Sequence, residues 1–183
     1  RPFYRLIYVG SLSRARGMRN MLDLLGRRQH KGLDTRLWLV GPDHDEMVEE
    51  LGKHSAWKWV DYLGLKDHDE ALALMGASDL GLAVLPDVAD HSDAMPSKLF
   101  EYMAMGLPFV ASDFPVWRSF VGEDAGQWVD PEDGQALSDA VYYLLTHPGE
   151  REECRQAARK VMNEFNWENE QAVLLDLYDR LIS

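Results

Sequence analysis

Residues 93 to 113 read Asp-Ala-Met-Pro-Ser-Lys-Leu-Phe-Glu-Tyr-Met-Ala-Met-Gly-Leu-Pro-Phe-Val-Ala-Ser-Asp, and they join a loop, a helix and a strand without a spacer. Pro96 suits the first helical position, because its φ is fixed and its missing N–H would have no partner there. Gly106 ends the helix. Apolar residues recur at helical spacing between these two points, at Leu99, Phe100, Met103 and Ala104. Residues 107 to 111 are continuously apolar, which is typical of a strand covered on both faces.

The start of this helix has the chemistry of a binding site. Its first backbone N–H groups, around Ser97 and Lys98, have no acceptor within a helix, so this end can bind an anion. Glu101 lies one turn further on and off the apolar face. We therefore expect a ligand at the point where the loop becomes a helix.

The composition limits the class of protein. The chain has 183 residues and a formal net charge of -12, which works against binding to nucleic acid or to an anionic membrane. Cys154 is the single cysteine and is interpreted as structural, and no run approaches the roughly 20 apolar residues of a membrane span. We expect one domain over residues 1 to 183, with no transmembrane segment, in the cytoplasm.

Short apolar strands alternate with amphipathic helices along the whole chain. Strands are expected at residues 6–9, 37–40, 57–63, 80–85, 107–111 and 126–129. This alternation predicts a doubly wound α/β fold, with a mostly parallel, six-stranded, Rossmann-like sheet and helices on both faces. In such a sheet ligands bind beyond the carboxyl ends of the strands. The last helix, residues 167 to 182, has a broad apolar face that must dock on another surface.

The tetrapeptide Asp-His-Asp-Glu occurs at residues 43–46 and again at 67–70. The acid-and-histidine pattern resembles a metal site, but an N-cap Asp with Glu three residues later predicts a capping box at each place. Asp130 before Pro131 likewise predicts a helix start. The loop 87–92 is interpreted as solvated. We expect no metal, since no His or Cys pairing has ligand spacing.

The loop from Gly10 to Gly17 joins the first strand to a helix. Its small residues suit phosphate, and Arg14 or Arg16 could add a bidentate contact. A tight turn with two solvated arginines explains the spacing equally well. The turn at Gly64 and Leu65 and the loop after Leu85 are expected at the same edge of the sheet.

Several segments together resemble the C-terminal half of retaining family 4 glycosyltransferases, which have the two-domain GT-B fold. The matching segments are Val9-Gly10-Ser11-Leu12, Arg16-Gly17, Leu39-Val40-Gly41, Tyr62-Leu63-Gly64, residues 96 to 108 with Val110-Ala111-Ser112, and Phe165-Asn166-Trp167. The resemblance covers essentially the whole chain.

The resemblance implies roles for two acids and two loop positions. Glu101 matches the acid that bonds the ribose hydroxyls, and Asp93, eight positions upstream, stands where the family has a longer acid near the donor sugar. Arg16 replaces a lysine and keeps a phosphate-binding cation. Ser11 replaces an arginine, which leaves open how the leaving diphosphate is neutralised unless Arg14 substitutes.

The implied ligand is a nucleotide-diphosphate sugar, held without a metal or other cofactor. The implied catalytic residues are Arg16 and Asp93. The implied substrate-binding residues are Gly10, Ser11, Arg14, Gly64, Leu65, Ala94, Met95, Pro96, Ser97, Lys98 and Glu101. The base, the sugar and the acceptor cannot be read from the sequence.

The resemblance also implies an enzyme that transfers a hexosyl unit, with retention, to a glycan, lipid-linked or small-molecule acceptor. The acceptor half is an N-terminal domain absent here, on which helix 167–182 docks and through which the protein lies at the membrane periphery. This chain alone is expected to transfer nothing. The alternatives are a non-catalytic nucleotide-sugar binding module, a nucleotide-sugar epimerase of the same architecture, and a domain without a ligand near Glu101.

Overall fold

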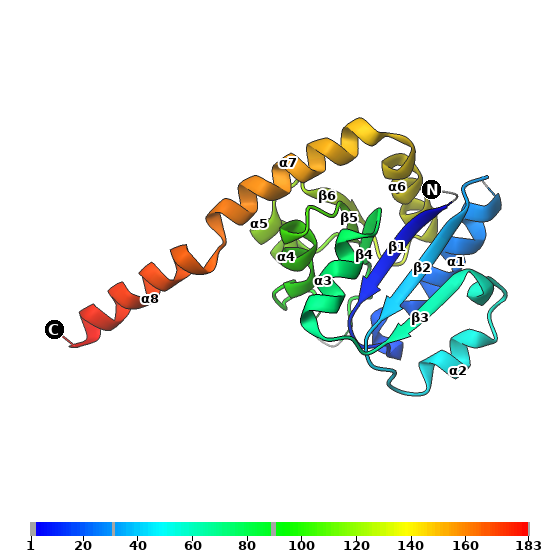
Figure 1. Cartoon of the computed structure of the whole chain (residues 1–183), viewed down its shortest axis with the longest axis horizontal. Helices are drawn as coiled ribbons and strands as arrows, with labels where there is room; N and C mark the ends of the chain where they lie inside the picture. Colours follow the sequence, from blue (N-terminus) through cyan, green and yellow to red (C-terminus); the bar gives the residue numbers. More distant parts are fainter. Residues whose placement is uncertain (1–2, 31, 89–90, 183) are drawn as a thin grey trace.

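The structure, a computed structural model, describes residues 3–30, 32–88 and 91–182, and its centre is one parallel sheet (Figure 1). Its strands are β1 (Tyr4–Val9), β2 (Thr35–Val40), β3 (Val60–Gly64), β4 (Leu80–Ala83), β5 (Phe109–Ser112) and β6 (Gly126–Val129). They lie in the order β3-β2-β1-β4-β5-β6, and every pair is parallel. The prediction of a six-stranded doubly wound sheet is confirmed. The strand order reverses between β1 and β4, where such folds bind ligands.

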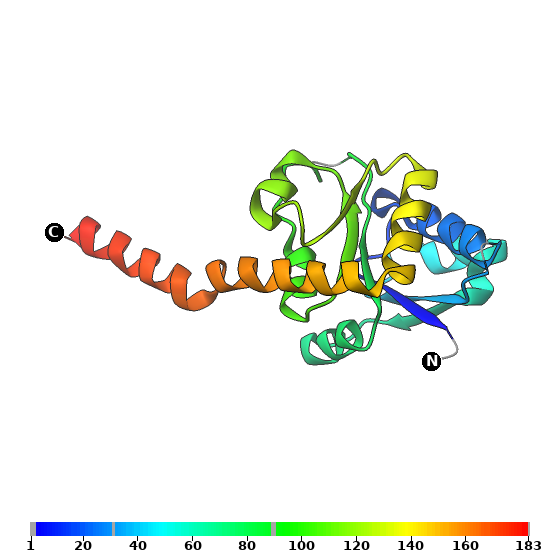
Figure 2. The ribbon, with the colours of Figure 1, turned by 90° about the horizontal axis from the view of Figure 1, so that it is seen from above.

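Helices cover both faces of the sheet. The helices of the described residues are η1 (Arg14–Arg16), α1 (Met18–His30), α2 (Met47–Gly52), η2 (Ser55–Trp59), α3 (His68–Gly76), α4 (Ser97–Ala104), α5 (Pro115–Val121), α6 (Gly134–Thr146), α7 (Pro148–Glu164) and α8 (Trp167–Ile182). Helices α1 and α6 pack together on one face, and α3 lies on the opposite face (Figure 2). Helix α7 contacts both α6 and α4.

The core explains why the central strands are apolar along their whole length. Strands β4 and β5 are buried at every position, because helices cover both of their faces. The buried face of helix α4 differs slightly from the face that the sequence predicts. Ala104 is exposed, and Tyr102 is buried in its place. The Tyr102 hydroxyl donates to the Leu82 carbonyl at 3.1 Å, so this ring can be buried with its polar end satisfied.

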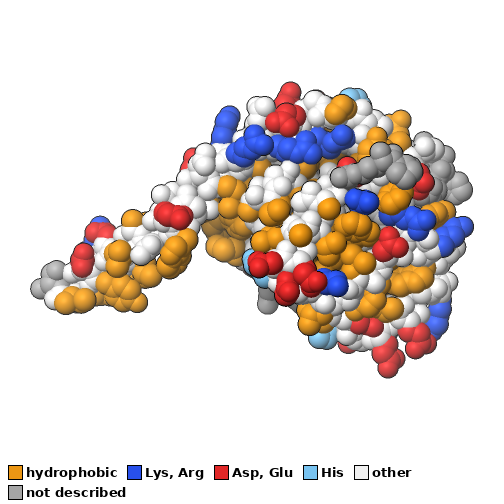
Figure 3. Space-filling view, in the orientation of Figure 1, with side chains coloured by type: hydrophobic (Ala, Val, Ile, Leu, Met, Phe, Trp, Pro, Cys, Tyr) orange, Lys and Arg blue, Asp and Glu red, His pale blue; other side chains and the backbone are white. Residues whose placement is uncertain are grey.

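Helix α8 differs from the rest of the molecule, because it projects away from the body in both ribbon views (Figures 1 and 2). Apolar side chains gather along its lower side in Figure 3. Its exposed large apolar residues are Trp167, Val173, Leu174, Leu175, Leu177, Tyr178, Leu181 and Ile182. We call this set the α8 stripe. Docking of α8 on another domain stays a prediction.

The two Asp-His-Asp-Glu segments have different structures. At residues 67–70 the capping box is confirmed, since the Glu70 N–H donates to Asp67 Oδ1 at 2.8 Å and the Asp67 N–H to Glu70 Oε2 at 3.4 Å. At residues 43–46 the prediction is wrong. Asp45 and Glu46 have left-handed backbone, with φ of 59° and 55°, and α2 begins only at Met47.

Tertiary contacts explain the difference. The segment from Pro42 to His44 pairs with the loop after β1, because the Leu12 N–H donates to the Pro42 carbonyl at 2.9 Å and the His44 N–H to the Leu12 carbonyl at 2.8 Å. These bonds hold residues 42 to 44 extended where a capping box needs the chain to turn. Asp43 Oδ1 still accepts from the Val48 N–H, at 3.2 Å.

Two further boundaries differ from the sequence prediction. Residues 57–59 belong to η2 and not to the third strand, since the His54 ring accepts from the Ala56 N–H at 3.2 Å and starts a turn there. The cap of α6 is Asp133, whose Oδ1 accepts from the Gln135 and Ala136 N–H groups, both at 2.9 Å. Asp130 accepts from the Glu132 N–H at 2.9 Å and closes the preceding turn.

Candidate functional site

Two adjoining hollows lie at the carboxyl ends of the strands. The smaller, which we call the α4 hollow, has a volume of about 70 Å³ and is lined by Arg16, Leu85, His91, Ala94, Met95, Pro96, Ser97, Lys98 and Trp117. The larger, the acidic hollow, has a volume of about 790 Å³ and is lined by Pro86, Asp87, Val88, Ser92, Asp93, Asp113, Phe114, Pro115, Val116, Asp130, Pro131 and Glu132. Asp93 lines the acidic hollow, and its neighbour in sequence, Ala94, lines the α4 hollow. The two hollows therefore share a wall.

The loop before α4 is folded back by a tight turn. The Ser97 N–H donates to the Met95 carbonyl at 2.9 Å across Pro96, whose φ of -81° and ψ of 67° are those of an inverse γ-turn. Pro96 therefore precedes the helix, and the Ser97 N–H already has an acceptor, contrary to the sequence prediction. The Trp117 indole donates to the Ala94 carbonyl at 2.9 Å and fixes this loop against α5.

Lys98 is the most unusual side chain of the site. Its Nζ atom is shielded from solvent and has no hydrogen-bond partner. The atom lies 4.0 Å from the centroid of the Tyr8 ring and beneath the backbone of Gly10, where a Cβ would lie 3.2 Å from it. Burial, with the positive charge of Arg16, lowers the pKa of Lys98 to about 7, although the Glu101 carboxylate opposes the shift.

A glycine brings Arg16 to the same hollow. Gly17 follows η1 with a left-handed φ of 67°, and a Cβ there would lie 2.8 Å from the Val84 carbonyl oxygen. Because only glycine tolerates both constraints, the turn packs directly on the end of β4. Arg16 thus lines the α4 hollow from one side while Lys98 lines it from another.

The loop after β4 is held at both ends. The Ser112 hydroxyl donates to the Leu85 carbonyl at 2.7 Å and accepts from the Leu85 N–H at 2.8 Å. His91 is 7% exposed, and its Nδ1 lies 3.0 Å from the Pro86 carbonyl oxygen. The prediction of a solvated loop is therefore wrong at His91. Residues 89 and 90 of that loop lie outside the described residues.

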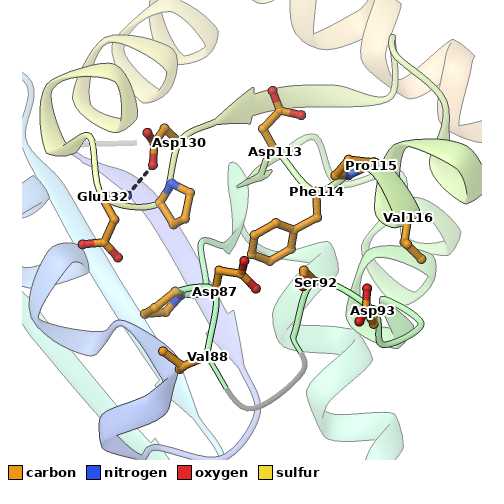
Figure 4. A pocket seen from close by; sticks show the side chains of 12 residues that line it. Asp87, Val88, Ser92, Asp93, Asp113, Phe114, Pro115, Val116, Asp130 and Glu132 are labelled. Carbon is orange, nitrogen blue, oxygen red and sulfur yellow. Dashed lines mark hydrogen bonds between the residues drawn. The ribbon is translucent and has the colours of Figure 1, made fainter.

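The acidic hollow gathers carboxylates from several loops (Figure 4). The five that line it in the described part of the chain are Asp87, Asp93, Asp113, Asp130 and Glu132. Asp113 is paired with Arg118 Nη2 at 2.9 Å, on the outer wall. Within residues 3–30, 32–88 and 91–182, no group of three or more His, Cys, Asp or Glu side chains has an arrangement that could hold a metal ion.

Some predicted residues lie elsewhere. Arg14 forms an ion pair with Glu50 at 2.9 Å and lines neither hollow. Ser11 accepts the Tyr8 hydroxyl through its backbone carbonyl at 3.0 Å. Gly64 ends β3, where its carbonyl accepts from the Gly41 N–H at 2.9 Å, and Leu65 is 74% exposed. Glu101 is half-buried, and its carboxylate is near enough to Lys98 to oppose part of the lowering of the Lys98 pKa.

The sequence interpretation missed several residues that line or border the hollows. Tyr8, one residue before the Val9-Gly10 segment, supplies the ring under Lys98. Asp113 and Asp130 directly follow β5 and β6. Their position after a buried strand is a sequence signal, since the carboxyl ends of parallel strands share one edge. His91 gives no such signal, because only the folded loop buries it.

Comparison with known proteins identifies the family. The sequence profile of the family described as Glycosyl transferases group 1 matches residues 3–161. The chain belongs to this family. Among its relatives, the glycogen synthase of Mycobacterium tuberculosis (strain ATCC 25618 / H37Rv) is 27% identical over 177 residues, which are 94% of this chain and 42% of that protein. The phosphatidyl-myo-inositol mannosyltransferase of Mycobacterium leprae is also 27% identical over 177 residues, or 95% of this chain and 46% of that protein. This Glycosyl transferases group 1 chain thus spans less than half the length of either relative.

Solved structures share the fold. The sucrose-phosphate synthase of Thermosynechococcus elongatus superposes with a TM-score of 0.84 at 21% identity, over 98% of this chain and 46% of that one. Anabaena Alr3699/HepE, solved in complex with UDP and glucose, has a TM-score of 0.78 at 18% identity, over 97% of this chain and 49% of that one. At these identities the likeness shows the fold, which is that of GT-B glycosyltransferases. None of the helices in the described residues has both the length and the apolar character needed to cross a membrane.

Proposed function

We propose that this chain is the donor-binding, C-terminal half of a retaining family 4 glycosyltransferase that transfers a hexosyl unit from a nucleotide-diphosphate sugar. The observation that carries the proposal is the α4 hollow, which is lined by Arg16 and by Lys98, whose Nζ has no hydrogen-bond partner and which interacts electrostatically with Glu101. This space lies near the reversal of strand order, between loops that follow β1 and β4.

Each part of the donor has a place in this arrangement. The diphosphate lies at the α4 hollow, where a planar guanidinium can bind two phosphate oxygens. The ribose hydroxyls donate to Glu101. The sugar extends past Asp93 toward the acidic hollow, whose carboxylates can accept from hydroxyl groups. In this proposal Gly64 and Leu65, at the end of β3, contact the base.

The charges fit the chemistry of transfer. When the bond between the anomeric carbon and the phosphate oxygen breaks, its electron pair stays on that oxygen and the leaving nucleotide gains negative charge. Fixed cations at the phosphates stabilise this charge more in the transition state than in the ground state, which accelerates the reaction. The site residues supply this without a metal ion in our proposal.

The acceptor and the rest of the catalytic machinery belong to a second, N-terminal domain. The relatives support this, because the chain spans less than half of their length. The α8 stripe is the surface proposed to dock on that domain. A peripheral contact with the cytoplasmic face of a membrane would come from the N-terminal domain. UDP and UDP-glucose in the Anabaena structures support a nucleoside diphosphate hexose as the donor class.

Calorimetric titration of the chain with UDP, GDP and ADP tests the proposal. We expect at least one to bind. Glu101→Ala should weaken that binding by about 10- to 100-fold, the cost of about 1.5 to 3 kcal/mol for a hydrogen bond to a charged acceptor. Glu49→Ala, which removes an acid paired with Lys53 on α2, is the matched control and should change nothing. The same preparations should show no sugar transfer by themselves. Absence of binding, or equal affinity in Glu101→Ala, would contradict the proposal.

A further inference from the structure

A buried ammonium group without an acceptor is costly, so the surroundings of Lys98 need an explanation. Nζ is out of contact with solvent, and no oxygen of the described residues accepts a hydrogen bond from it. A charged group buried in this way is normally paired or loses its charge. An exposed conformation would avoid the cost, yet the side chain extends inward under Gly10.

Four titratable or charged groups face Lys98, one from each element around it. Tyr8, on β1, places its ring 4.0 Å from Nζ and donates its own hydroxyl to the Ser11 carbonyl. Arg16, from η1, and His91, from the loop after β4, line the same hollow. Glu101, one turn along α4, interacts with Lys98 electrostatically without an ion pair. None of the four supplies the acceptor that Nζ lacks.

The α4 hollow, which Lys98 helps to line, offers room for that acceptor. Its volume of about 70 Å³ equals the liquid volume of about two water molecules, which an entering phosphoryl group would displace. The family resemblance implies a second cation where this loop has Ser11, and in the structure Arg14 is exposed, paired with Glu50 and absent from the lining of both hollows. One cation then remains on the loop side, Arg16.

We propose that Lys98 is the second cation of the diphosphate subsite, in the role that Ser11 cannot fill, and that its amine gains a proton as the nucleoside diphosphate binds. The phosphate oxygens supply the missing acceptors and the opposite charge, so the bound ligand stabilises the ammonium form relative to the neutral amine. After sugar transfer the leaving nucleotide has one more negative charge than it had in the donor, and the protonated Lys98 stabilises that charge.

This inference deepens the proposed function and rests on it. It makes the affinity for the nucleotide depend on pH in a definite direction. Burial lowers the pKa of free Lys98 to about 7, and the bound phosphate raises it. The contribution of protonated Lys98 to the binding free energy is therefore complete below the pKa that Lys98 has in the free chain. It is lost as the pH rises through the pKa that Lys98 has in the complex. Tyr8 stays neutral throughout, since burial raises its pKa to about 12.

The test is calorimetry of the 183-residue chain with UDP, GDP and ADP in buffers of different ionisation enthalpy, which gives the number of protons taken up. At about pH 8, roughly two units above the second pKa of about 6 of a phosphate, the terminal phosphate is almost fully ionised and contributes little proton exchange of its own. We expect uptake near one proton per nucleotide at about pH 8, and a loss of affinity of up to about tenfold per pH unit above the free-state pKa.

Variants separate Lys98 from its neighbours. Lys98→Met should abolish proton uptake and weaken binding by about 10- to 100-fold. Lys53→Met, which removes an exposed lysine directly after α2 that pairs with Glu49, should change neither. Lys98→Arg should bind without uptake. Uptake that persists in both Lys98 variants would assign it to another group, such as His91, and overturn the proposal.

A measurement on the unaltered chain guards against a variant that fails to fold. The ¹³C resonance of Lys98 Cε, titrated with pH, should report a pKa near 7 without nucleotide and one at least about two units higher with it. Binding that Glu101→Ala weakens, but that takes up no proton and leaves this resonance unchanged, would overturn the role of Lys98 and leave the proposed function intact. Failure of all three nucleotides to bind would overturn both.

Discussion

The α4 hollow and the acidic hollow share a wall, but their charged side chains differ in sign and in exposure to solvent. Lys98 Nζ is shielded from water and unpartnered, whereas carboxylates such as Asp93 and Glu132 are exposed. An exposed carboxylate is stabilised by water and needs no ligand, but a shielded amine without an acceptor is a cost that folding has to offset. The small hollow is therefore the more specific sign of a ligand, although the large one is the more visible.

The opposite charges of the two hollows also set the orientation in which the proposed donor would bind. With a net charge of -12, the chain repels anions in general, so attraction has to be local. At physiological ionic strength, screening by salt limits the range over which each charge acts to about 8 Å. Phosphates would thus enter where Arg16 and Lys98 lie, and the acidic hollow would exclude them while its carboxylates accept sugar hydroxyls.

The largest expected effect is a difference in nucleotide affinity between variants of the two arginines of η1. Arg16 lines the α4 hollow, whereas Arg14 pairs with Glu50. We expect Arg16→Met to weaken nucleoside diphosphate binding by about 10- to 100-fold through loss of charge-assisted hydrogen bonds, and Arg14→Met to weaken it by less than about twofold. Calorimetry on both variants measures this. Equal losses would mean that the loop binds phosphate through general charge rather than through the α4 hollow.

A smaller effect should distinguish the sugar from the diphosphate. Asp93→Ala should weaken binding of the nucleotide sugar by about 2- to 10-fold, the cost of about 0.5 to 1.5 kcal/mol for one hydrogen bond, and leave the free diphosphate unaffected. Asp69→Ala, which removes an exposed acid in the first turn of α3 that lines neither hollow, is the matched control and should weaken neither ligand. Competition between UDP-glucose and UDP on each variant provides the readout. If Asp93→Ala weakens both ligands alike, the acidic hollow does not contact the sugar.

The smallest effect concerns the outer wall of the acidic hollow. Arg118 bonds both Asp113 and Glu123, and these carboxylates raise its pKa, the Asp113 hydrogen bond most of all. All three side chains are open to solvent, so Arg118→Ala should lower the free energy of unfolding by less than about 1 kcal/mol and leave nucleotide affinity unchanged. Urea denaturation measures the first quantity. A loss above about 2 kcal/mol would show that this pair holds the loop after β5 in place.

Most of the fold could be predicted because its signals are local. Short apolar runs gave β1, β2 and β4 to β6, and Asp67 with Glu70 marked the start of α3. Candidate site residues followed from position, since loops after parallel strands meet at one edge. Whether those residues hold a ligand stays a prediction. Their relative arrangement could not be predicted, because the direction of a long side chain depends on neighbours distant in sequence.

The alternation of strands and helices, and therefore the parallel sheet with loops along one edge, follows from local sequence, because hydrophobic periodicity and capping act between residues a few positions apart. Only the tertiary structure decided which of two identical Asp-His-Asp-Glu segments became a cap, since the loop after β1 pairs with the first of them. It also decided that Arg14 bonds Glu50, and that Lys98 extends under Gly10 to lie on Tyr8 without an acceptor. Burial and pairing of charge depend on contacts between distant segments, which no local pattern encodes.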